Sequence, residues 1–312
     1  MRGALWGAVA FIAVSSAVDA RAPAVAPFER PDEVVPATRI DELVGASLQV
    51  AGIESAYLCS DEVFVRRAHL DIIGTLPEPL VVRAFLQDRR PEKRARLIDS
   101  LLERPEFADY WAMKWCDVLR VKAEFPINLW PNAVQCYQRW VREAMATNKP
   151  YDLFARELLT SSGSAFRVPP ANFYRAVQGR KPEDIAGAVA LTFMGTRLAS
   201  WPQTERENLA RFFFRVAYKK TDEWKEEIVC LDPTPLGPFD ATLPDGTAVH
   251  IAADQDPRQV FADWLLADGN PWFARAIVNR VWAWLLGRGI VEEPDDIRPD
   301  NPPSNPELLA YL

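Results

Sequence analysis

Proline and glycine divide residues 40–216 into a series of short amphipathic stretches. Most stretches begin with a proline at or near the first turn of a helix, where the missing N–H costs little because it would have no partner inside the helix. The pattern therefore predicts a mainly α-helical fold. Ser60 can cap the first helix and Gly74 can end it. The expected helices cover residues 61–74, 78–87, 91–103, 105–121, 131–147, 151–160, 182–195 and 203–216.

Residues 227–251 differ in composition, because they are rich in proline, glycine and residues that favour strands. Within them, residues 243–249 predict a β-hairpin that turns at Asp245-Gly246. Helical patterns resume at 257–267 and 271–286. We expect three parts: a multi-helix globular domain at 40–226, a short β-hairpin linker at 227–256, and an incomplete second helical domain at 257–312.

The end of the chain is the reason for expecting an incomplete domain. Residues 306–312 resemble a helix cut short, with Leu308, Leu309 and Leu312 on one apolar side. The preceding helix carries an apolar stripe formed by Phe273, Ile277, Val281, Trp284 and Leu285. This stripe needs a cover, so we expect it either to pack on the first domain or to stay exposed and promote self-association.

The N-terminus predicts a secreted protein. Arg2, an apolar run at 4–14 and small residues at 18–20 are together typical of a signal peptide spanning residues 1–20. The run is shorter than the ~18 apolar residues that cross a bilayer, so we expect no membrane span after the signal is removed. Residues 21–39 predict a flexible leader. A periplasmic, otherwise extracytoplasmic or secreted location follows.

Four cysteines would meet an oxidising compartment: Cys59, Cys116, Cys136 and Cys230. Three disulfide pairings are open to them, and the sequence does not choose among these. Because Cys116 and Cys136 lie in successive predicted helices, a bridge between them is the pairing we favour. Four free thiols are the alternative, since cysteine also packs well as a small apolar residue.

The formal net charge of −7 argues against binding to nucleic acid or to an anionic lipid surface, because both need a cationic face. The chain also has eleven Trp and sixteen Phe. Their helical spacing leads us to interpret them as core residues first and as a binding surface second.

A search for catalytic motifs leaves the catalytic residues unknown. The two histidines, His69 and His250, are far apart in sequence, which excludes a site that needs several histidines. We interpret His69 as a helix-surface or core residue of the first strong helix. The sequence has no G-x-S-x-G, no P-loop, no G-x-G-x-x-G and no Cys-x-x-Cys.

The densest polar segment is the loop 294–305. Three carboxylates in it form a candidate calcium site: Asp295, Asp296 and Asp300. Their spacing lacks the order of an EF-hand loop. The alternative is that one of the first two pairs with Arg275 or Arg280 of the preceding helix, while Ser304 or Asn305 caps the last helix.

Several segments resemble a family of secreted, planctomycete cytochrome-like proteins with two consecutive domains of unknown function. Residues 64–77, 93–102 and 148–152 resemble the first domain, and residues 270–282, 287–289 and 301–309 resemble the second. The residues that carry these motifs are Arg66, Arg67, Asp71, Gly74, Asn279, Arg280, Trp282, Gly287, Gly289, Asn301 and Ser304. The resemblance implies no activity, because the family is defined by sequence.

Many members of that family carry a Cys-x-x-Cys-His loop, which attaches haem, between segments similar to 193–198 and 201–203. Here only Ala199 and Ser200 separate Leu198 from Trp201. The two thiols and the axial histidine are missing, so we expect no cofactor and no covalent haem.

These observations favour a binding or scaffold module whose partner is an unknown protein or an extracellular polymer, with self-association into a homo-oligomer as a further option. The first alternative is a secreted hydrolase that acts on an extracellular polymer through Asp71, Asp117 or Asp295. Arg67 lies four residues before Asp71, however, which suits a helix-surface ion pair better. The second alternative is a haem-free component of an electron-transfer complex. A cleft with a carboxylate of raised pKa would favour the enzyme, and a broad apolar patch would favour the binding module.

Overall fold

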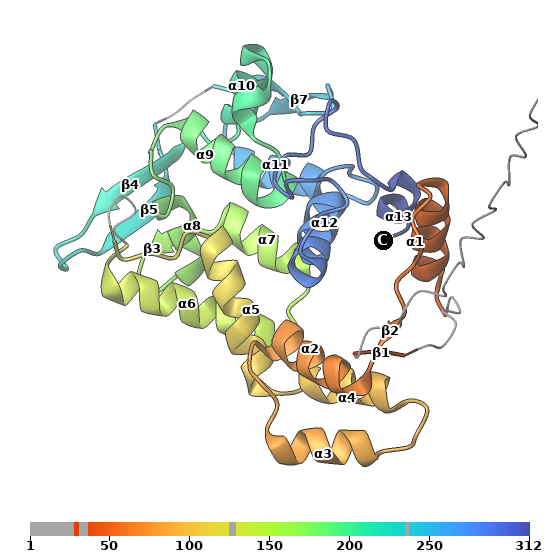
Figure 1. The fold of residues 1–312 in the computed structure, drawn as a ribbon. Coiled ribbons are helices and arrows are strands. Elements are labelled where there is room, and N and C mark those ends of the chain that lie inside the picture. The colour runs from red at the N-terminus through yellow and green to blue at the C-terminus, as the bar shows by residue number, and fades with distance from the viewer. Residues whose placement is uncertain (1–27, 31–36, 125–128, 235–236) are drawn as a thin grey trace, which may run out of the picture.

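The computed structural model describes residues 28–30, 37–124, 129–234 and 237–312, which form a mainly α-helical protein with a few small sheets (Figure 1). The predicted signal peptide lies outside these ranges. Among the helices within them, none combines the length and the hydropathy that crossing a bilayer requires. The α-helices are α1 (Arg39–Val50), α2 (Asp61–Ile73), α3 (Pro79–Gln87), α4 (Lys93–Leu102), α5 (Pro105–Val118), α6 (Trp130–Ala146), α7 (Tyr151–Thr160), α8 (Asn172–Arg175), α9 (Pro182–Val189), α10 (Gln203–Ala210), α11 (Pro257–Leu265), α12 (Phe273–Leu286) and α13 (Pro306–Tyr311).

The strands are short and all pair in antiparallel fashion. They are β1 (Glu29–Arg30), β2 (Leu58–Cys59), β3 (Gly163–Ser164), β4 (Val216–Lys220), β5 (Glu227–Leu231), β6 (Phe239–Thr242) and β7 (Ala248–Ile251). The sheet β3-β5-β4 joins a segment that follows α7 to a hairpin some fifty residues further on. The pairing of β1 with β2 places part of the predicted flexible leader against the segment before α2.

The predicted helix signals are confirmed at several positions. The Ser60 hydroxyl accepts a hydrogen bond from the Val63 N–H at 3.5 Å, and Gly74 ends α2 with φ of 70°. A Cβ at Gly74 would lie 2.3 Å from the Tyr110 ring, so glycine also permits a close approach there. His69 is buried, and its Nδ1 lies 2.8 Å from the Val65 carbonyl oxygen, as expected for a core histidine whose ring is satisfied locally.

The helix predicted for residues 203–216 is too long. Helix α10 ends at Ala210, and the chain then turns so that Phe212 and Phe213 enter the core. Val216 begins strand β4, which pairs with β5 along its whole length. The strand forms because of a partner distant in sequence, and hydrophobic periodicity does not report such a partner.

The hairpin predicted near Asp245-Gly246 is confirmed as the β6–β7 pair, with Gly246 at φ of 88° in its turn. Buried side chains of this hairpin and its turn, Ala241, Leu243 and Ile251, belong to the same hydrophobic core as the helices before it. Whether residues 227–256 also divide the chain into two domains stays a prediction.

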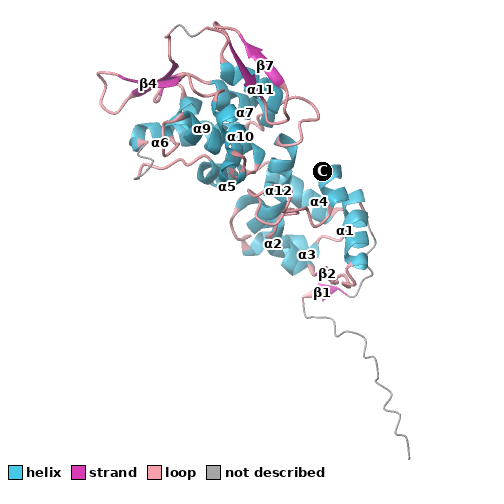
Figure 2. Cartoon of the chain, turned by 90° about the horizontal axis from the view of Figure 1, so that it is seen from above, coloured by secondary structure: helices cyan, strands magenta, loops and turns pink. Residues whose placement is uncertain are grey.

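The largest core is formed between α5, α6, α7, α9 and α11. A smaller hydrophobic cluster lies within the lobe formed by α2–α4. Figure 2 shows this lobe and α1 at one end of the molecule, with β4 and β7 at the other end. A third cluster packs Leu43 of α1 against Leu308 and Leu309 of α13. The apolar side of the last helix is therefore covered by α1, while Leu312 is exposed.

All four cysteines lie in the described residues, and all are free. The favoured Cys116–Cys136 bridge was therefore wrong, and the free-thiol alternative describes the structure. Burial raises the pKa of the Cys116 thiol to about 11, and burial also raises the pKa of Cys136. A raised pKa disfavours the thiolate, which is the nucleophilic form of cysteine.

Candidate functional site

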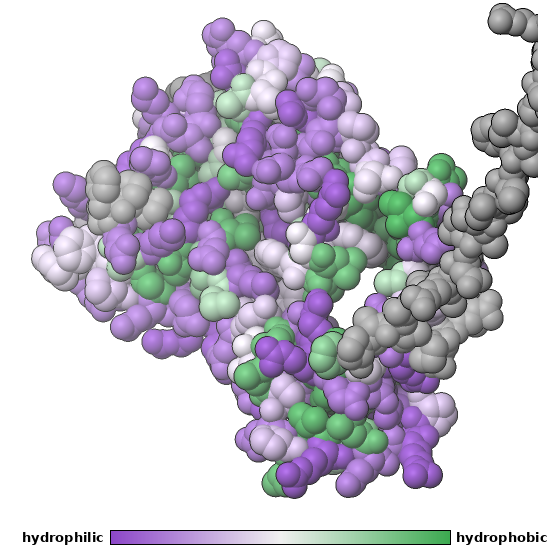
Figure 3. Space-filling view, viewed as in Figure 1, coloured by the Kyte–Doolittle hydropathy of each residue, from purple (hydrophilic) through white to green (hydrophobic). Residues whose placement is uncertain are grey.

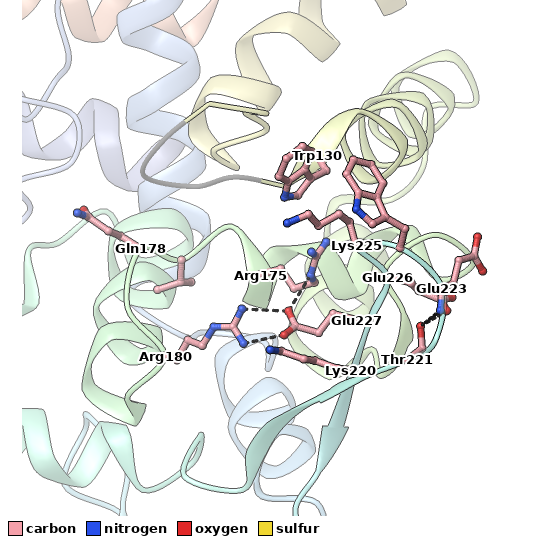
Figure 4. A pocket seen from close by; sticks show the side chains of 12 residues that line it. Trp130, Arg175, Gln178, Arg180, Lys220, Thr221, Glu223, Lys225, Glu226 and Glu227 are labelled. Carbon is pink, nitrogen blue, oxygen red and sulfur yellow. Dashed lines mark hydrogen bonds and ion pairs between the residues drawn. The ribbon is translucent and has the colours of Figure 1, made fainter.

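A polar cavity of about 530 Å³ lies beside the turn that joins β4 to β5 (Figure 4). Its walls come from Trp130 at the start of α6, from residues of 175–180 at the end of α8, and from residues of 220–227 in the turn. We call it the tryptophan pocket, because Trp130 and Trp224 line it together.

The fold holds the two walls of the tryptophan pocket in uncommon backbone conformations. Trp130 and Lys225 have φ of 64° and 63°, in the left-handed region that residues other than glycine rarely adopt. The Lys225 Nζ lies 4.3 Å from the centre of the Trp130 ring, so the two residues also touch. Such conformations cost about 1–3 kcal/mol each and occur often at ligand-binding positions.

Hydrogen bonds fix the shape of the turn. The Thr221 hydroxyl accepts from the Glu223 N–H at 3.2 Å and donates to Glu226 at 2.8 Å. Ser164 of β3 donates a second hydrogen bond to Glu226. Hydrogen bonds from Ser164 and then Thr221 lower the pKa of Glu226, so its carboxyl is ionised at neutral pH.

Glu227 is a buried acid of the tryptophan pocket. Figure 4 shows Arg175 and Arg180 both directed at its carboxylate, with N–O distances of 3.1 Å from Arg175 and 2.8 Å and 3.0 Å from Arg180. Burial alone would raise the pKa of Glu227, but the hydrogen bonds from Arg180 and Arg175 outweigh it and lower the pKa. The carboxylate is thus a fixed anion that orients two guanidinium groups.

The exposed part of the tryptophan pocket is aromatic and cationic. The Trp224 side chain is 69% exposed, and its ring centre lies 5.0 Å from that of Trp130. The Nζ of Lys225 lies near both rings, while Lys220 lies beside Glu227 in Figure 4. A flat apolar surface next to ammonium groups can bind a ring-shaped ligand that is apolar on its face and polar at its edge.

A second cavity, of about 680 Å³, is an apolar groove between the α2–α4 lobe and α12. Figure 3 shows apolar side chains gathered at this boundary. We call it the apolar groove; Phe64, Ile98, Leu102, Phe107, Val281 and Leu285 are among the residues that line it. The family-motif residues Arg67 and Asp71 lie at this groove and form the expected ion pair at 3.0 Å.

The acidic loop after α12 contains the ion pair with Arg280 that the alternative interpretation expected. Asp295 pairs with Arg280, and Asp296 and Asp300 pair with Arg298 at 3.0 Å and 3.2 Å. Within the described residues, no cluster of three or more histidine, cysteine or acidic side chains is arranged to hold a metal ion. The Asn305 side chain caps α13 by accepting from the Leu308 N–H, as the alternative expected.

The family-motif residues after α11 have structural partners. Asn279 is fully buried and binds the backbone of Val291, against which Gly289 also packs closely. The Arg280 guanidinium donates to the carbonyls of Thr192 at 2.8 Å and Leu191 at 3.0 Å. These carbonyls belong to a π-helical turn, Ala190–Met194, so Arg280 ties α12 to the end of the helix that begins at α9.

The other family-motif residues order the loop and its neighbours. Asn301 donates to the Glu292 carbonyl at 2.8 Å, and Ser304 donates to the Ile290 carbonyl at 2.9 Å. Gly287 ends α12 with φ of 80°, Trp282 packs on the cluster between α1 and α13, and Arg66 is exposed on α2.

The three carboxylates considered for hydrolysis occupy different elements. Asp71 is on α2, Asp117 on α5 and Asp295 in the loop after α12. Asp71 lines the apolar groove, and neither of the other two does. The other histidine, His250, lies 2.8 Å from Asp240 on the exposed β6–β7 hairpin.

A short turn connects the two segments between which many family members carry the haem loop. Residues Leu198–Ser200 form one 3₁₀ turn, and the Trp201 Nε1 then donates to the Thr196 hydroxyl at 3.2 Å. The Trp201 ring lies 5.5 Å from that of Trp272. The expectation of no covalent haem stays a prediction.

The tryptophan pocket was not predicted from the sequence. One signal for it is present in the segment 219–227, where every residue other than Trp224 and Thr221 is charged. An isolated tryptophan in such a segment indicates an exposed aromatic ring.

The protein is therefore mainly helical, and its cavities include the tryptophan pocket and the apolar groove. Residues 39–200 match the family PSCyt2, described as a protein of unknown function (DUF1549), and residues 257–312 match PSD1, a protein of unknown function (DUF1553). The first match covers just over half of the 312 residues, so the chain belongs to the PSCyt2 family. The chain matches no curated protein and no solved structure.

Proposed function

We propose that this protein is an extracytoplasmic binding module without haem of its own, and that its tryptophan pocket binds a segment of an extracellular polysaccharide. The observation that carries the proposal is Trp224, a residue that is 69% exposed and lies beside Trp130 in a cavity with polar walls. The apolar face of a sugar ring packs on such a surface while its hydroxyl groups reach the polar walls.

The electrostatics of the described residues support binding over hydrolysis. A carboxyl that acts as general acid needs a raised pKa. Every described Asp or Glu whose pKa departs clearly from its usual value has it lowered, including Glu226 and Glu227 in the tryptophan pocket. Such carboxylates position cations and accept hydrogen bonds.

The location and the lack of haem rest on sequence features. The segment 1–20 supports export, and the link Ala199-Ser200 in place of Cys-x-x-Cys-His supports a haem-free chain. Sequencing of the mature N-terminus from the extracytoplasmic fraction tests the first point. A pyridine haemochrome spectrum after expression with a cytochrome c maturation system tests the second, and a stoichiometric c-type signal would refute it.

The binding role is tested by affinity electrophoresis of the full chain through gels that contain single soluble polysaccharides, neutral and acidic. We expect at least one polysaccharide to retard the protein and Trp224→Ala to remove the retardation. Tyr311→Ala is the matched control, because Tyr311 is also an exposed aromatic residue but lies on α13, outside the pocket. Retardation that survives Trp224→Ala, or no retardation by any polysaccharide, would contradict the proposal.

A further inference from the structure

We propose that the tryptophan pocket selects an anionic saccharide, whose carboxylate or sulfate groups are bound by the ammonium groups of Lys220 and Lys225. This inference rests on the proposed function and adds the charge of the ligand to it. Carboxylates and sulfates share the chemistry that matters here, a compact anion at the edge of a sugar ring.

The acidic groups of the tryptophan pocket already have partners. Glu227 is bound by Arg175 and Arg180, and Glu226 accepts from two hydroxyl groups, with the Arg167 Nε at 4.0 Å. Glu223 lies at the rim, where the Arg167 Nη2 is 3.5 Å away. The carboxylates therefore do not compete strongly for further cations.

Unlike the acidic residues of the tryptophan pocket, its two lysines have no ion-pair partner within the part of the chain that the structure describes. Among the described residues, neither Lys220 nor Lys225 forms an ion pair, and Figure 4 draws no dashed line from either. The Lys225 Nζ lies over the Trp130 ring at 4.3 Å and 5.7 Å from the Trp224 ring centre. Ring contact leaves the charge of the ammonium group without an anion, so an anionic ligand supplies the missing partner.

The position of Lys225 fits a ligand that stacks on Trp224. Its backbone φ is 63°, a conformation that residues other than glycine rarely adopt, and its ammonium group lies beside the two aromatic rings. An anion attached to a sugar ring that packs on Trp224 would then lie near this ammonium group. The whole chain carries a net charge of −7, so the free lysines are a local exception to its overall charge.

The geometry of the two tryptophans favours a saccharide over a single-stranded nucleic acid. Their rings meet edge to face, at 65° and a centre distance of 5.0 Å, so they leave no parallel slot into which a base could insert. Only an outer face is open for stacking.

The test compares four probes in the same electrophoresis: dextran sulfate, polygalacturonate, neutral dextran and a single-stranded oligothymidylate. We expect dextran sulfate, polygalacturonate or both to retard the chain, and dextran to retard it much less. Lys225→Gln and Lys220→Gln should each weaken binding to the acidic polysaccharide by about three- to tenfold, as for loss of one ordinary hydrogen bond at a solvent-accessible site. Retardation should also decrease as NaCl rises from about 0.05 M to about 0.5 M.

Lys219→Gln is the matched control. It removes the same charge from the same strand, but successive side chains of a strand point to opposite faces, and Lys219 does not line the pocket. If Lys219→Gln and Lys220→Gln weakened binding to the acidic polysaccharides equally, the effect would be one of general charge and the inference would be overturned. Equal retardation by dextran and by the acidic polymers would overturn the anion selectivity but leave the proposed function intact. Retardation by the oligothymidylate alone would overturn both.

Discussion

The side chain of Asn279 exchanges two hydrogen bonds with the backbone of Val291. Its amide group donates to the Val291 carbonyl at 3.1 Å, and its carbonyl oxygen accepts from the Val291 N–H at 2.9 Å. Asn279 lies inside α12, while Val291 belongs to the loop that follows it, so this pair fixes the loop against its own helix. Asn279, one of the family-motif residues, therefore has a structural role in the local fold.

Asn279→Ala should destabilise the protein by about 2–4 kcal/mol, because it removes both hydrogen bonds and leaves a buried N–H and carbonyl without a partner. Urea unfolding followed by circular dichroism measures the loss. Gln49→Ala, an exposed amide on α1, is the control and should change stability by less than about 0.5 kcal/mol. Equal stabilities of the two variants would show that the Asn279–Val291 pair contributes little.

Two glycines should respond to alanine with opposite sign. A Cβ at Gly289 would lie 2.3 Å from the Val291 carbonyl oxygen and 3.0 Å from the Asn279 amide, so Gly289→Ala should cost about 1–3 kcal/mol. A Cβ at Gly45, inside α1, meets nothing within 4 Å, so Gly45→Ala should stabilise the protein by about 0.5–1 kcal/mol. The difference between the two melting temperatures is the measurement. A stabilising Gly289→Ala would contradict the close packing of this loop.

Much of the helical fold could be predicted because its signals are local. Ser60 and Gly74 bound α2, and the prolines at the starts of α3, α5 and α9 mark helices where they occur. The same reasoning missed β4, since a strand depends on partners that lie far away in the sequence.

The tryptophan pocket was missed for a related reason. Trp130 and Trp224 are about ninety residues apart, and only the sheet and the start of α6 bring them within 5.0 Å. Helical spacing led us to interpret the tryptophans as core residues first, which holds for Trp115 but not for Trp224. The charged residues on both sides of Trp224 are the sequence feature that distinguishes this exposed tryptophan from the buried Trp115.

Acid should destabilise the protein through Glu227. Its pKa is lower in the folded protein than the value of about 4.3 in an unfolded chain, so its ionised form stabilises the fold above that value. This contribution is lost as the pH falls from about 4.3 through the lower folded-state pKa. Thermal unfolding between pH 7 and about pH 3 should show a decrease in Tm below about pH 4.

Glu227→Gln should lower the Tm at pH 7, because Arg175 and Arg180 lose their anion. The difference in Tm between this variant and the unmodified protein should become smaller as the pH falls below about 4. Glu92→Gln is a suitable control, since Glu92 is exposed and its contact with Arg96 spans 3.9 Å. A gap that stays constant with pH would show that Glu227 does not contribute through its charge.

The apolar stripe of α12 is divided between a packed side and an open side. Phe273 stacks on Tyr151 with ring centres 4.6 Å apart, and Trp284 meets Trp111 and Trp115 at 5.7 Å and 6.0 Å. Val281 and Leu285 instead line the apolar groove. The two expectations for this stripe, packing on the helices before it and exposure, thus each describe part of it.

The two sides of α12 should respond differently to substitution. Trp284→Ala should cost about 2–3 kcal/mol, somewhat less than loss of a fully buried tryptophan, because the ring is only partly buried. Leu286→Ala, on the same helix but 59% exposed, is its control and should change stability by less than about 0.5 kcal/mol.

Leu285→Gln should keep the fold and reduce self-association, since it places a polar group in the apolar groove. Size-exclusion chromatography with light scattering separates these effects: we expect the unmodified protein to form dimers or larger species at high concentration and Leu285→Gln to shift it toward monomer. A protein that stays monomeric at every concentration, with Leu285→Gln unchanged, would show that the groove does not join copies of this chain.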